Sequence, residues 1–517
     1  MLIKNGKIID GFSKKMFNAD IRIEKDKIQE IGTLKAKNQE QILNAKGMYI
    51  TPGFVDILNH SDAYLTLFEN TAQESLLQQG ITTILIGNCG SSLAPLVNGI
   101  FINSIQKWGD TSKINLNWLS VSEYLNELSR HSFGVNLATL MGHSTIRRAL
   151  VGDDSRSLTT QEQKQLEYMI EVGMREGAFG VSSGLAYSHG KNATAKELRF
   201  IMNIVKKYDG LYSVHIKNEA DGFLDSVKEM ISLVKESGVN MELSHLKVIE
   251  KEFWNKFEEA LALIEKSNTV NFDVYPYTFT ASVAYTFLPR WASEGGNSTI
   301  RPILKDPQKR EKLLEDMKKD PYSYAQLVVA MGNINKTYFG KKIGDIAKNQ
   351  GKEPEEVLLE LILASDNRLI VFSTTIDENN IKMALKHPKS IVTSDGVGYQ
   401  EKDKHKGAFV HPRYFGAIPK FLGEYVREQK LLSWEEAINK ISLKPAEKIG
   451  LKNRGKLVKG YYADIVIFDP NKIGTEANLN NPYRYPQGIK WVLVNGNIAV
   501  EENKLKSKLG RILKRNE

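Results

Sequence analysis

Residues 211–245 read LYSVHIKNEADGFLDSVKEMISLVKESGVNMELSH, and this stretch decides the fold. It begins with a short apolar run at 211–214, continues with apolar residues at helical spacing over 221–237, and then reaches Gly238, a typical residue after a helix end. A second short run follows at 241–243. Strand, helix and strand in this order predict a βαβ unit, in which the two strands are parallel.

The same alternation extends in both directions along the chain. With about eight repeats, an α/β fold of the (β/α)8 TIM-barrel type is the economical prediction, and a doubly wound open sheet is the alternative. Capping patterns that begin at Thr194 and at Ser433 indicate two of the helix starts. The predicted strands are 48–57, 81–86, 138–141, 179–182, 211–214, 241–243, 271–275 and 390–393.

Short strand patterns at the two ends of the chain are alike. Asn5-Gly6 separates two apolar runs near the N-terminus, and Asn495-Gly496 separates two more near the C-terminus. Asn-Gly between such runs predicts a hairpin, because both residues tolerate a positive φ. Residues 21–32 alternate apolar and polar side chains around a turn near 25–26. We therefore predict one small β-sandwich domain assembled from both termini.

These patterns divide the chain into domains. The β-sandwich takes residues 1–50 and 446–517, and the barrel takes residues 51–445. Residues from about 288 to 366 break the alternation, because they are rich in lysine, mostly helical in pattern and interrupted by Gly295-Gly296 and by prolines. We predict an inserted helical segment, a lid at the barrel mouth, with a long decorated loop as the alternative.

Composition excludes several classes of protein. Of the 517 residues, 41% are apolar and 25% are charged, which is typical of a globular protein. No apolar run is long enough to span a membrane and the N-terminus lacks a signal core, so we expect a cytoplasmic location. The net charge of +9 comes from lysines spread along the chain, which favours a solvated surface over a nucleic-acid or membrane partner. The single cysteine, Cys89, excludes an internal disulfide.

Polar side chains follow most of the predicted strands. In a (β/α)8 barrel the catalytic groups lie at the carboxyl ends of the strands, so side chains that directly follow strands meet there. We therefore expect one site that collects His60, Asp62, Cys89, His143, His215, His245 and Asp395.

The chemistry of these residue types favours a metal centre. Zinc prefers thiolate and imidazole ligands, and a catalytic zinc keeps one position open for water, so Cys89, His215 and His245 form a suitable set. Asp395 could orient that water, accept its proton and deliver it to a leaving amine. The alternatives are that Cys89 is a small buried side chain and that the histidines are ordinary.

Taken in order, the motifs of the chain resemble the amidohydrolase superfamily and, within it, the N-acyl-D-amino-acid deacylase (D-aminoacylase) family. The resemblance runs nearly from end to end. The matching motifs are Thr51-Pro-Gly-Phe-Val-Asp56, Gln79-Gly-Ile-Thr-Thr83, Gly87-Asn-Cys-Gly90, Ser92-Leu-Ala-Pro95, Gly142-His143-Ser144, residues 177–185, His215-Ile-Lys-Asn-Glu219, Ser244-His245-Leu-Lys247, Tyr275-Pro-Tyr277, Ser394-Asp395-Gly396, His411-Pro-Arg413 and residues 463–470.

The resemblance implies both an activity and a set of site residues. It implies zinc-dependent hydrolysis of the linear amide of an N-acyl-D-amino acid, with Asp395 as the catalytic acid and base. It also implies one tightly bound Zn²⁺ ion on Cys89, His215 and His245, with His60 as a further candidate ligand. Residues that would hold the α-carboxylate of a small-molecule substrate are Lys247, Tyr277 and Arg413, with His143 as a further candidate.

The chain departs from the superfamily pattern at three places. Leu58 replaces the first histidine of the usual His-x-His, which leaves a second metal site doubtful. Lys217 stands where similar proteins often carry arginine, so the positive charge is kept but the planar guanidinium group, with its fork of hydrogen-bond donors, is lost. Residues 179–185 contain no lysine, whereas similar hydrolases of cyclic amides carry a carboxylated lysine there or nearby. The absence of this lysine, together with the site built on a single cysteine, favours a linear amide; a cyclic or dipeptide-like substrate and a non-catalytic barrel remain alternatives.

Overall fold

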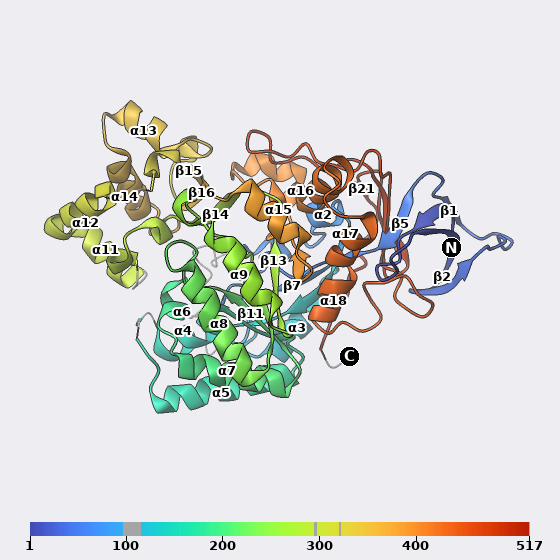
Figure 1. Cartoon of the computed structure of the whole chain (residues 1–517), viewed down its shortest axis with the longest axis horizontal. Coiled ribbons are helices and arrows are strands. Elements are labelled where there is room, and N and C mark those ends of the chain that lie inside the picture. The colour runs from blue at the N-terminus through green and yellow to red at the C-terminus, as the bar shows by residue number, and fades with distance from the viewer. Residues whose placement is uncertain (97–114, 153, 155, 294–296, 320–321, 516–517) are drawn as a thin grey trace.

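The structure is a computed structural model that describes residues 1–96, 115–152, 154, 156–293, 297–319 and 322–515. Figure 1 shows a central body of parallel strands and helices, with a lobe that carries α11 to α14 on one side and a sheet that contains strands from both termini on the other. Within the described ranges, no helix combines the length and the apolar character that crossing a membrane requires.

The central body contains two parallel sheets. The first has the order β6-β7-β8, and the second has the order β9-β10-β11-β12-β13-β17. Leu140 alone separates β8 from β9, so the two sheets continue into each other along the chain. The strands are β6 (Phe54–Asp56), β7 (Ile81–Ile86), β8 (Asn136–Thr139), β9 (Met141–Gly142), β10 (Gly180–Gly184), β11 (Leu211–His215), β12 (Asn240–Leu243), β13 (Val270–Val274) and β17 (Ser390–Val392).

The segments after the outermost strands of this series also meet. Asn59, after β6, forms an isolated parallel bridge with Gly396, after β17. The His60 amide donates a hydrogen bond to the Gly396 carbonyl at 2.9 Å. Within each of the two sheets the strands follow one another in chain order, and the segments after the first and last strands of the series lie side by side.

The predicted first strand, 48–57, proves to be two strands in different sheets. β5 (Tyr49–Pro52) belongs to the terminal sheet, and β6 belongs to the central body. Gly53 separates them, and a Cβ there would lie 2.2 Å from Oγ1 of Thr82. The apolar pattern ran through this boundary because both strands are buried, so periodicity gave no sign of the change of sheet.

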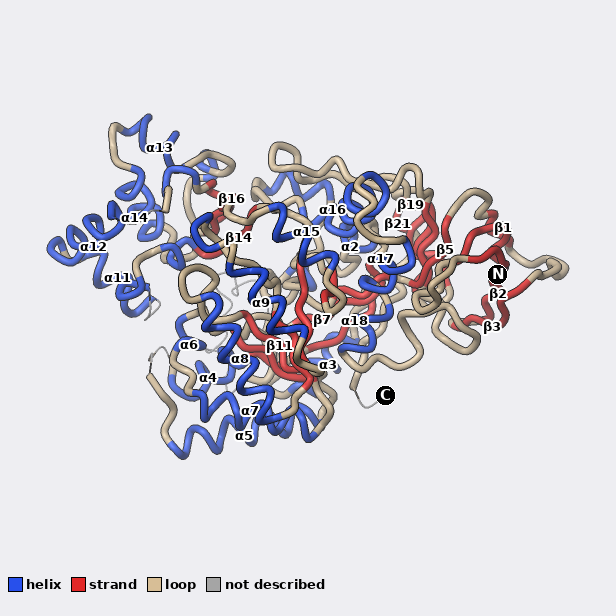
Figure 2. The backbone as a smooth tube through the Cα atoms, viewed as in Figure 1, coloured by secondary structure: helices blue, strands red, loops and turns tan. Residues whose placement is uncertain are grey.

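Amphipathic helices cover the outside of the parallel strands (Figure 2). The predicted helix over 221–237 is found as α8, which ends at Ser237 and is capped by Gly238 with φ of 62°. The main helices are α3 (Val121–Ser129), α4 (His143–Val151), α5 (Thr160–Arg175), α7 (Ala195–Lys207), α8 (Phe223–Ser237), α9 (Lys256–Glu265), α15 (Glu378–Lys386), α16 (Arg413–Lys420), α17 (Trp434–Ile441) and α18 (Leu443–Lys448); α1 (Thr66–Glu69), α2 (Glu74–Leu77) and α6 (Ser188–Lys191) are short, and a π-helical segment (Phe421–Glu428) follows α16.

The two predicted capping patterns have different outcomes. At Ser433 both halves of the capping box are present. At Thr194 the hydroxyl accepts a hydrogen bond from the Glu197 amide, but the Glu197 carboxylate does not accept one from the Thr194 amide, so the second half of the capping box is absent. It binds His143 and Arg147 in the protein interior instead.

Strands from both termini form one sheet of nine strands. The order is β21-β20-β19-β18-β5-β1-β2-β3, and β4 pairs with β1. The strands are β1 (Leu2–Ile8), β2 (Phe17–Glu24), β3 (Lys27–Gly32), β4 (Ile42–Asn44), β5 (Tyr49–Pro52), β18 (Ile465–Phe468), β19 (Ile489–Val494), β20 (Asn497–Glu501) and β21 (Lys504–Leu505).

Only one of the two predicted Asn-Gly hairpins is correct. Asn495-Gly496 turns β19 into β20, with φ of 48° and 84°. Asn5-Gly6 instead lies inside β1, where the pairing register with β2 shifts between Ile3 and Gly6 and Asn5 has φ of 65°. The same positive φ that suits a hairpin turn also suits a bulge, so the dipeptide alone did not separate the two.

The inserted lobe extends beyond the predicted bounds of about 288–366 and contains more than helices. β14 and β16 lie on either side of those bounds and pair in the order β14-β16-β15 with a strand inside them, and five α-helices accompany these strands. A hydrophobic core separate from that of the central body includes Leu313, Val329 and Leu358. The strand β15 is a short apolar run that periodicity does not distinguish from helix, and Gly295-Gly296 lies outside the described residues. The elements are β14 (Phe279–Val283), α10 (Arg290–Ser293), α11 (Asn297–Lys305), α12 (Pro307–Lys319), β15 (Val328–Met331), α13 (Ile343–Gln350), α14 (Pro354–Ala364) and β16 (Ile370–Thr374).

Candidate active site

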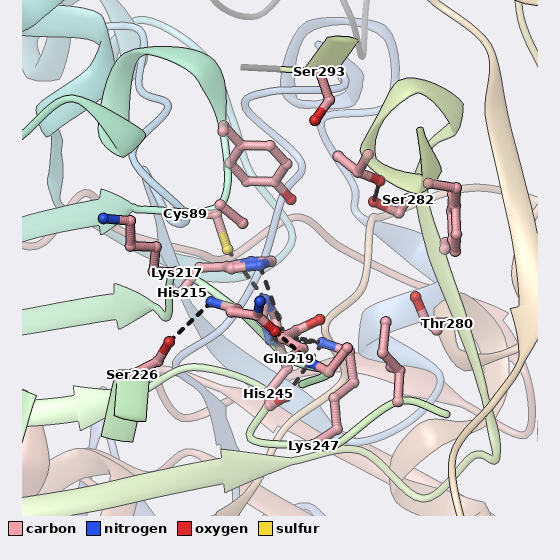
Figure 3. A pocket seen from close by; sticks show the side chains of 18 of the residues that line it. Cys89, His215, Lys217, Glu219, Ser226, His245, Lys247, Thr280, Ser282 and Ser293 are labelled. Carbon is pink, nitrogen blue, oxygen red and sulfur yellow. Dashed lines mark hydrogen bonds and ion pairs between the residues drawn. The ribbon is translucent and has the colours of Figure 1, made fainter. Parts of the chain in front are cut away.

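One thiol and two imidazoles converge at the carboxyl ends of three parallel strands. Cys89 follows β7, His215 ends β11 and His245 follows β12. One ligand atom from each residue lies within 4.8 Å of those of the other two, and all three residues are buried. Cys89 Sγ is 3.4 Å from His245 Nε2, and Figure 3 shows the sulfur beside the two rings. The three residues predicted to bind metal are therefore brought together.

The backbone around this cluster is strained. Cys89, His245 and Asp395 have φ of 51°, 36° and 44°, in the left-handed region that side chains with a Cβ rarely adopt. Such conformations persist only where surrounding contacts enforce them. For Cys89, Ser182 of β10 supplies such contacts, because its hydroxyl accepts the Gly90 amide at 2.9 Å and donates to the Gly87 carbonyl.

The electrostatic surroundings favour the thiolate. Burial raises the pKa of the Cys89 thiol, but the charge of His245 and hydrogen bonds from His215 and His245 outweigh burial and hold the pKa well below its usual value. A thiolate is the form that binds a metal ion. The cluster is thus chemically suited to zinc, as the residue types predicted.

Asp395 follows β17 and is held by two cationic side chains. Its Oδ1 lies 2.9 Å from His60 Nε2, and its Oδ2 lies 2.9 Å from Arg413 Nη2. Burial would raise the pKa of this carboxyl, but Arg413 and the hydrogen bond from His60 keep the pKa far below its usual value. The side chain is therefore an ionised acceptor close to the cluster.

Glu219 is a site residue to which the sequence analysis assigned no role. Its Oε1 lies 2.5 Å from Lys247 Nζ, 3.5 Å from His245 Nδ1 and 3.7 Å from His215 Nε2. The signal was present, since Glu219 is four residues after His215 in a quoted motif. Carboxylates commonly orient metal-binding histidines through the second ring nitrogen, and Glu219 is placed to do so for His245.

A cavity of about 740 Å³ opens above the cluster. Its size suits a small-molecule ligand. Lys217, the residue that replaces an arginine of similar proteins, also lines it. The sequence-predicted residues in its wall are His60, Cys89, His215, His245, Lys247, Asp395 and Arg413.

Two residues predicted to contact substrate lie elsewhere. His143 begins α4 and is fully buried, with Nδ1 3.1 Å from Ser183 Oγ and Nε2 2.7 Å from Glu197 Oε1. It lines none of the cavity wall described for this structure. Tyr277 is also outside that wall, whereas Tyr275, two residues earlier, is part of it.

Two further positions from the sequence analysis, Asp62 and Leu58, both contact the segment around Cys89. Asp62, expected near the site, accepts a hydrogen bond from the Gly87 amide at 2.9 Å and so supports the loop that carries Cys89. Leu58, the residue in place of a histidine, is fully buried and packs in one apolar cluster with Cys89 and Tyr187. An isobutyl side chain thus occupies this position beside the thiol.

A cysteine, two histidines and an ionised aspartate at the ends of parallel strands are typical of metal-dependent hydrolases. Comparisons with known proteins agree. Residues 369–500 match the model of the amidohydrolase family. N-acyl-D-glutamate deacylase of Alcaligenes xylosoxydans xylosoxydans is 30% identical over 100% of this chain and 96% of its own length. D-aminoacylase of the same organism is 28% identical over 100% of this chain and 97% of its own length.

Solved structures give the same result. The zinc and phosphonate inhibitor complex of N-acyl-D-glutamate deacylase from Bordetella bronchiseptica superposes with a TM-score of 0.83 at 27% identity, over 99% of both chains. A D-hydantoinase from Thermus sp. reaches 0.56 at 17% identity, over 99% of this chain and 98% of its own, which indicates a shared fold only. The protein belongs to the amidohydrolase family, in the group of N-acyl-D-amino-acid deacylases.

Proposed function

We propose that the protein hydrolyses the linear amide bond of N-acyl-D-amino acids in a zinc-dependent reaction, releasing a carboxylate and a free D-amino acid. The observation that carries this proposal is the Cys89, His215 and His245 cluster beside the ionised Asp395, in a cavity that Lys247 and Arg413 also line. The deacylase activities of the relatives support the choice of substrate class.

The residues present fit one zinc ion. Cys89 would supply a thiolate, and His215 and His245 would each supply an imidazole nitrogen. Nδ1 of His215 is buried without a hydrogen-bond partner among the described residues, which is costly unless a ligand engages the ring. Zinc bound there would polarise the amide carbonyl and favour the ionisation of water. We propose a single tight site, because Leu58 offers no ligand for a second ion.

Asp395 is the proposed acid and base. Its ionised carboxylate can accept the proton of the attacking water and then return it to the leaving nitrogen. His60 and Arg413 hold its two oxygens in place, so the carboxylate meets the reacting atoms in a fixed orientation. His60 is a positioning residue in this scheme.

Cationic side chains in the cavity suit the substrate α-carboxylate. Lys247 is buried and paired with Glu219, and Arg413 is buried and paired with Asp395. Arg413 keeps Nη1 buried without a partner among the described residues, and a guanidinium can bind a carboxylate in a planar, directional way. Lys247 Nζ contacts Glu219 and His245, so it would add its positive charge to the pocket. We assign substrate binding to these two residues.

We also propose how the sheets and the inserted lobe are arranged, which the strand pairing alone does not determine. We take the parallel strands as a closed (β/α)8 barrel, which the contact between the segments after β6 and β17 supports. We take the terminal sheet as a β-sandwich folded around a shared core, which the packing of Ile3 and Ile23 with Ile465 and Leu493 supports. The inserted lobe then stands at the barrel mouth, because Ser282 and Thr286 reach the cavity wall.

The test combines elemental analysis with a substrate screen. Purified protein is expected to contain about one zinc per chain and to hydrolyse N-acetyl-D-amino acids but not the L-enantiomers. Asp395→Asn should keep the zinc and lose activity by about 100-fold or more. Preferred hydrolysis of a cyclic amide such as a hydantoin, substoichiometric zinc, or full activity of Asp395→Asn would refute the proposal.

A further inference from the structure

We propose that Glu197 of α7 positions the metal ligand Cys89, although Glu197 lines none of the cavity wall described for this structure. This inference rests on the proposed role of Cys89 as a zinc ligand and adds a positioning residue to it. The path runs from Glu197, through α4, to the loop that carries Cys89. It gives a role to His143, the predicted substrate-binding residue that binds Glu197 instead.

The Glu197 carboxylate is buried between two side chains of α4. Its Oε1 lies 2.7 Å from His143 Nε2, and both of its oxygens accept hydrogen bonds from Arg147 Nη1. All three residues are almost fully buried. Burial would raise the pKa of the Glu197 carboxyl, but His143 and Arg147 outweigh burial and lower the pKa below its usual value. Removal of this charge would leave the buried guanidinium uncompensated, which is costly.

Two contacts with one carboxylate fix the position of α4. His143 and Arg147 are four residues apart, so they share one face of the helix. Because α4 is attached at two successive turns, it cannot slide along its axis or rotate about it without breaking one of these contacts. Nδ1 of His143 also lies 3.1 Å from Ser183 Oγ of β10, so the start of the helix is attached to the sheet as well.

The first turn of α4 contacts the residues that directly follow Cys89. The Thr145 amide donates a hydrogen bond to the Gly90 carbonyl at 3.2 Å, and the Ser92 amide donates to the Thr145 hydroxyl at 3.0 Å. The Gly142 amide, at the N-cap, donates to Ser92 Oγ at 2.8 Å. Amides at a helix start have no partner within the helix, and here two of them hold the Cys89 loop.

The loop after Cys89 fits tightly between α4 and β10. A Cβ at Gly142 would lie 2.6 Å from the Gly90 carbonyl oxygen, and a Cβ at Gly90 would lie 2.7 Å from the Gly184 amide nitrogen. Any displacement of α4 therefore acts directly on Gly90. The neighbouring Cys89 has φ of 51°, a strained conformation that persists only while surrounding contacts enforce it.

A displaced α4 should therefore move the Cys89 sulfur relative to the two histidines of the cluster. Cys89 Sγ is 3.4 Å from His245 Nε2, and a zinc–sulfur bond of about 2.3 Å leaves little tolerance for a shift of the thiolate. Loss of the Glu197 charge is thus expected to weaken metal binding through Cys89. A role in stability alone would leave metal binding unchanged in every variant that folds.

A buried carboxylate elsewhere in the chain provides a matched control. Asp464, which directly precedes β18, is buried and pairs with Nη1 of the buried Arg454. Glu197→Gln and Asp464→Asn each remove the charge of a buried carboxylate that pairs with an arginine, but only the first carboxylate binds α4. Thr145→Val tests the other end of the path, because it removes the hydroxyl that accepts the Ser92 amide and leaves the Glu197 contacts in place.

The experiment measures zinc and cobalt binding to the full-length protein. The zinc Kd is obtained by competition with a chelator, and Co²⁺ reports the thiolate through its sulfur-to-cobalt charge-transfer absorption. Glu197→Gln is expected to weaken zinc binding by about 10- to 100-fold and to weaken or shift this absorption. Thr145→Val should weaken zinc binding by about threefold or more in the same way. Asp464→Asn should melt at a lower temperature but keep its zinc Kd within about twofold of the wild type.

The control and the second variant decide between positioning and general destabilisation. Unchanged zinc affinity and cobalt absorption in a folded Glu197→Gln would overturn the inference. An equal loss of zinc affinity in Asp464→Asn would also overturn it, because the effect would then be a general one. Thermal melting shows which variants fold, and if Glu197→Gln does not, unchanged zinc binding in Thr145→Val overturns the inference.

An activity assay on the same preparations separates this inference from the proposed function. A wild type that binds zinc but hydrolyses no N-acetyl-D-amino acid would refute the function, and weaker zinc binding in Glu197→Gln would still support the inference. A wild type that hydrolyses these substrates, with Glu197→Gln binding zinc equally well, would refute the inference alone. A wild type that takes up neither zinc nor cobalt would refute both.

Discussion

His60 Nε2 lies 2.9 Å from Asp395 Oδ1, and this contact connects the segment after the first parallel strand with the segment after the last. The hydrogen bond to Asp395 helps to raise the pKa of His60 to about 10 against the opposing effect of burial. The carboxylate is thus held on one side by an imidazole and on the other by the guanidinium of Arg413. The orientation of the proposed acid and base depends on both neighbours.

Replacing His60 should damage turnover more than metal binding. In His60→Ala the Asp395 carboxylate loses one of its two fixed partners, so we expect kcat to fall by about 10-fold or more while about one zinc per chain remains. His60→Gln keeps a side-chain donor and should recover part of the loss. Steady-state kinetics and elemental analysis of the same preparations measure both effects. Loss of zinc from His60→Gln would identify His60 as a ligand instead.

Leu58 offers a direct test of the number of metal sites. The wild type is expected to bind about one zinc per chain at saturation, because a leucine cannot ligate. Leu58→His introduces an imidazole next to Cys89 and near His60, and we expect zinc stoichiometry to rise toward about two. Leu58→Gln introduces a polar side chain of similar size and should not change the stoichiometry. Two zinc ions bound tightly by the wild type would contradict this expectation.

Stability in acid should depend on Glu40, which lies in the loop between β3 and β4 of the terminal sheet. A hydrogen bond from Arg22, together with the Lys37 amide, lowers the pKa of Glu40 from 4.5 to about 2. The folded state therefore binds this proton less tightly than the unfolded state does. The stability that Glu40 contributes is fully present above about pH 4.5 and is lost as the pH falls toward 2.

Melting curves of two variants test this pH dependence. Glu40→Gln should melt below the wild type at about pH 7, and the difference should shrink steadily toward about pH 2.5. Glu24→Gln changes an exposed glutamate of β2 in the same sheet and should show a much smaller difference at neutral pH. A melting difference for Glu40→Gln that grows as the pH falls would contradict the predicted pH dependence of the stability that Glu40 contributes.

The inserted lobe should lose structure independently of the central body. Leu358 of α14 is fully buried in the separate core of the lobe, so Leu358→Ala should cost about 2–5 kcal/mol there. Leu363 lies in the same helix and is 37% exposed, so Leu363→Ala should cost much less. Limited proteolysis should cut the Leu358→Ala lobe faster while zinc stays bound. Simultaneous loss of zinc and of the lobe would mean that the two parts unfold together.

The parallel strands were predictable because each is a short buried run between helices. β7 occupies the predicted residues 81–86, and β11 extends the predicted run by one residue to His215. Buried parallel strands read as continuous apolar runs, so their positions depend little on tertiary detail. The metal cluster was predictable for the same reason, since its members follow these strands directly.

The errors occurred where one local signal fits two structures. Asn5-Gly6 suits both a hairpin turn and a bulge, and the sheet selects the bulge. His143 follows a strand, yet its ring is drawn into the interior by Glu197. Tyr277, which the resemblance implied for substrate binding, lies outside the cavity wall that contains Tyr275, because a turn follows Tyr275. In each case the deciding contact is distant in sequence or depends on the backbone path.

The left-handed backbone at Cys89 and His245 places strain at two proposed metal ligands. Glycine adopts a positive φ without this cost, so selection of random variants for thermal resistance alone should favour glycine at Cys89, although that change removes the thiol. Asp395→Gly would not gain stability in this way, because it leaves the buried Arg413 guanidinium without its carboxylate partner. Variants selected for heat resistance would therefore have to be screened for zinc binding and turnover in every round.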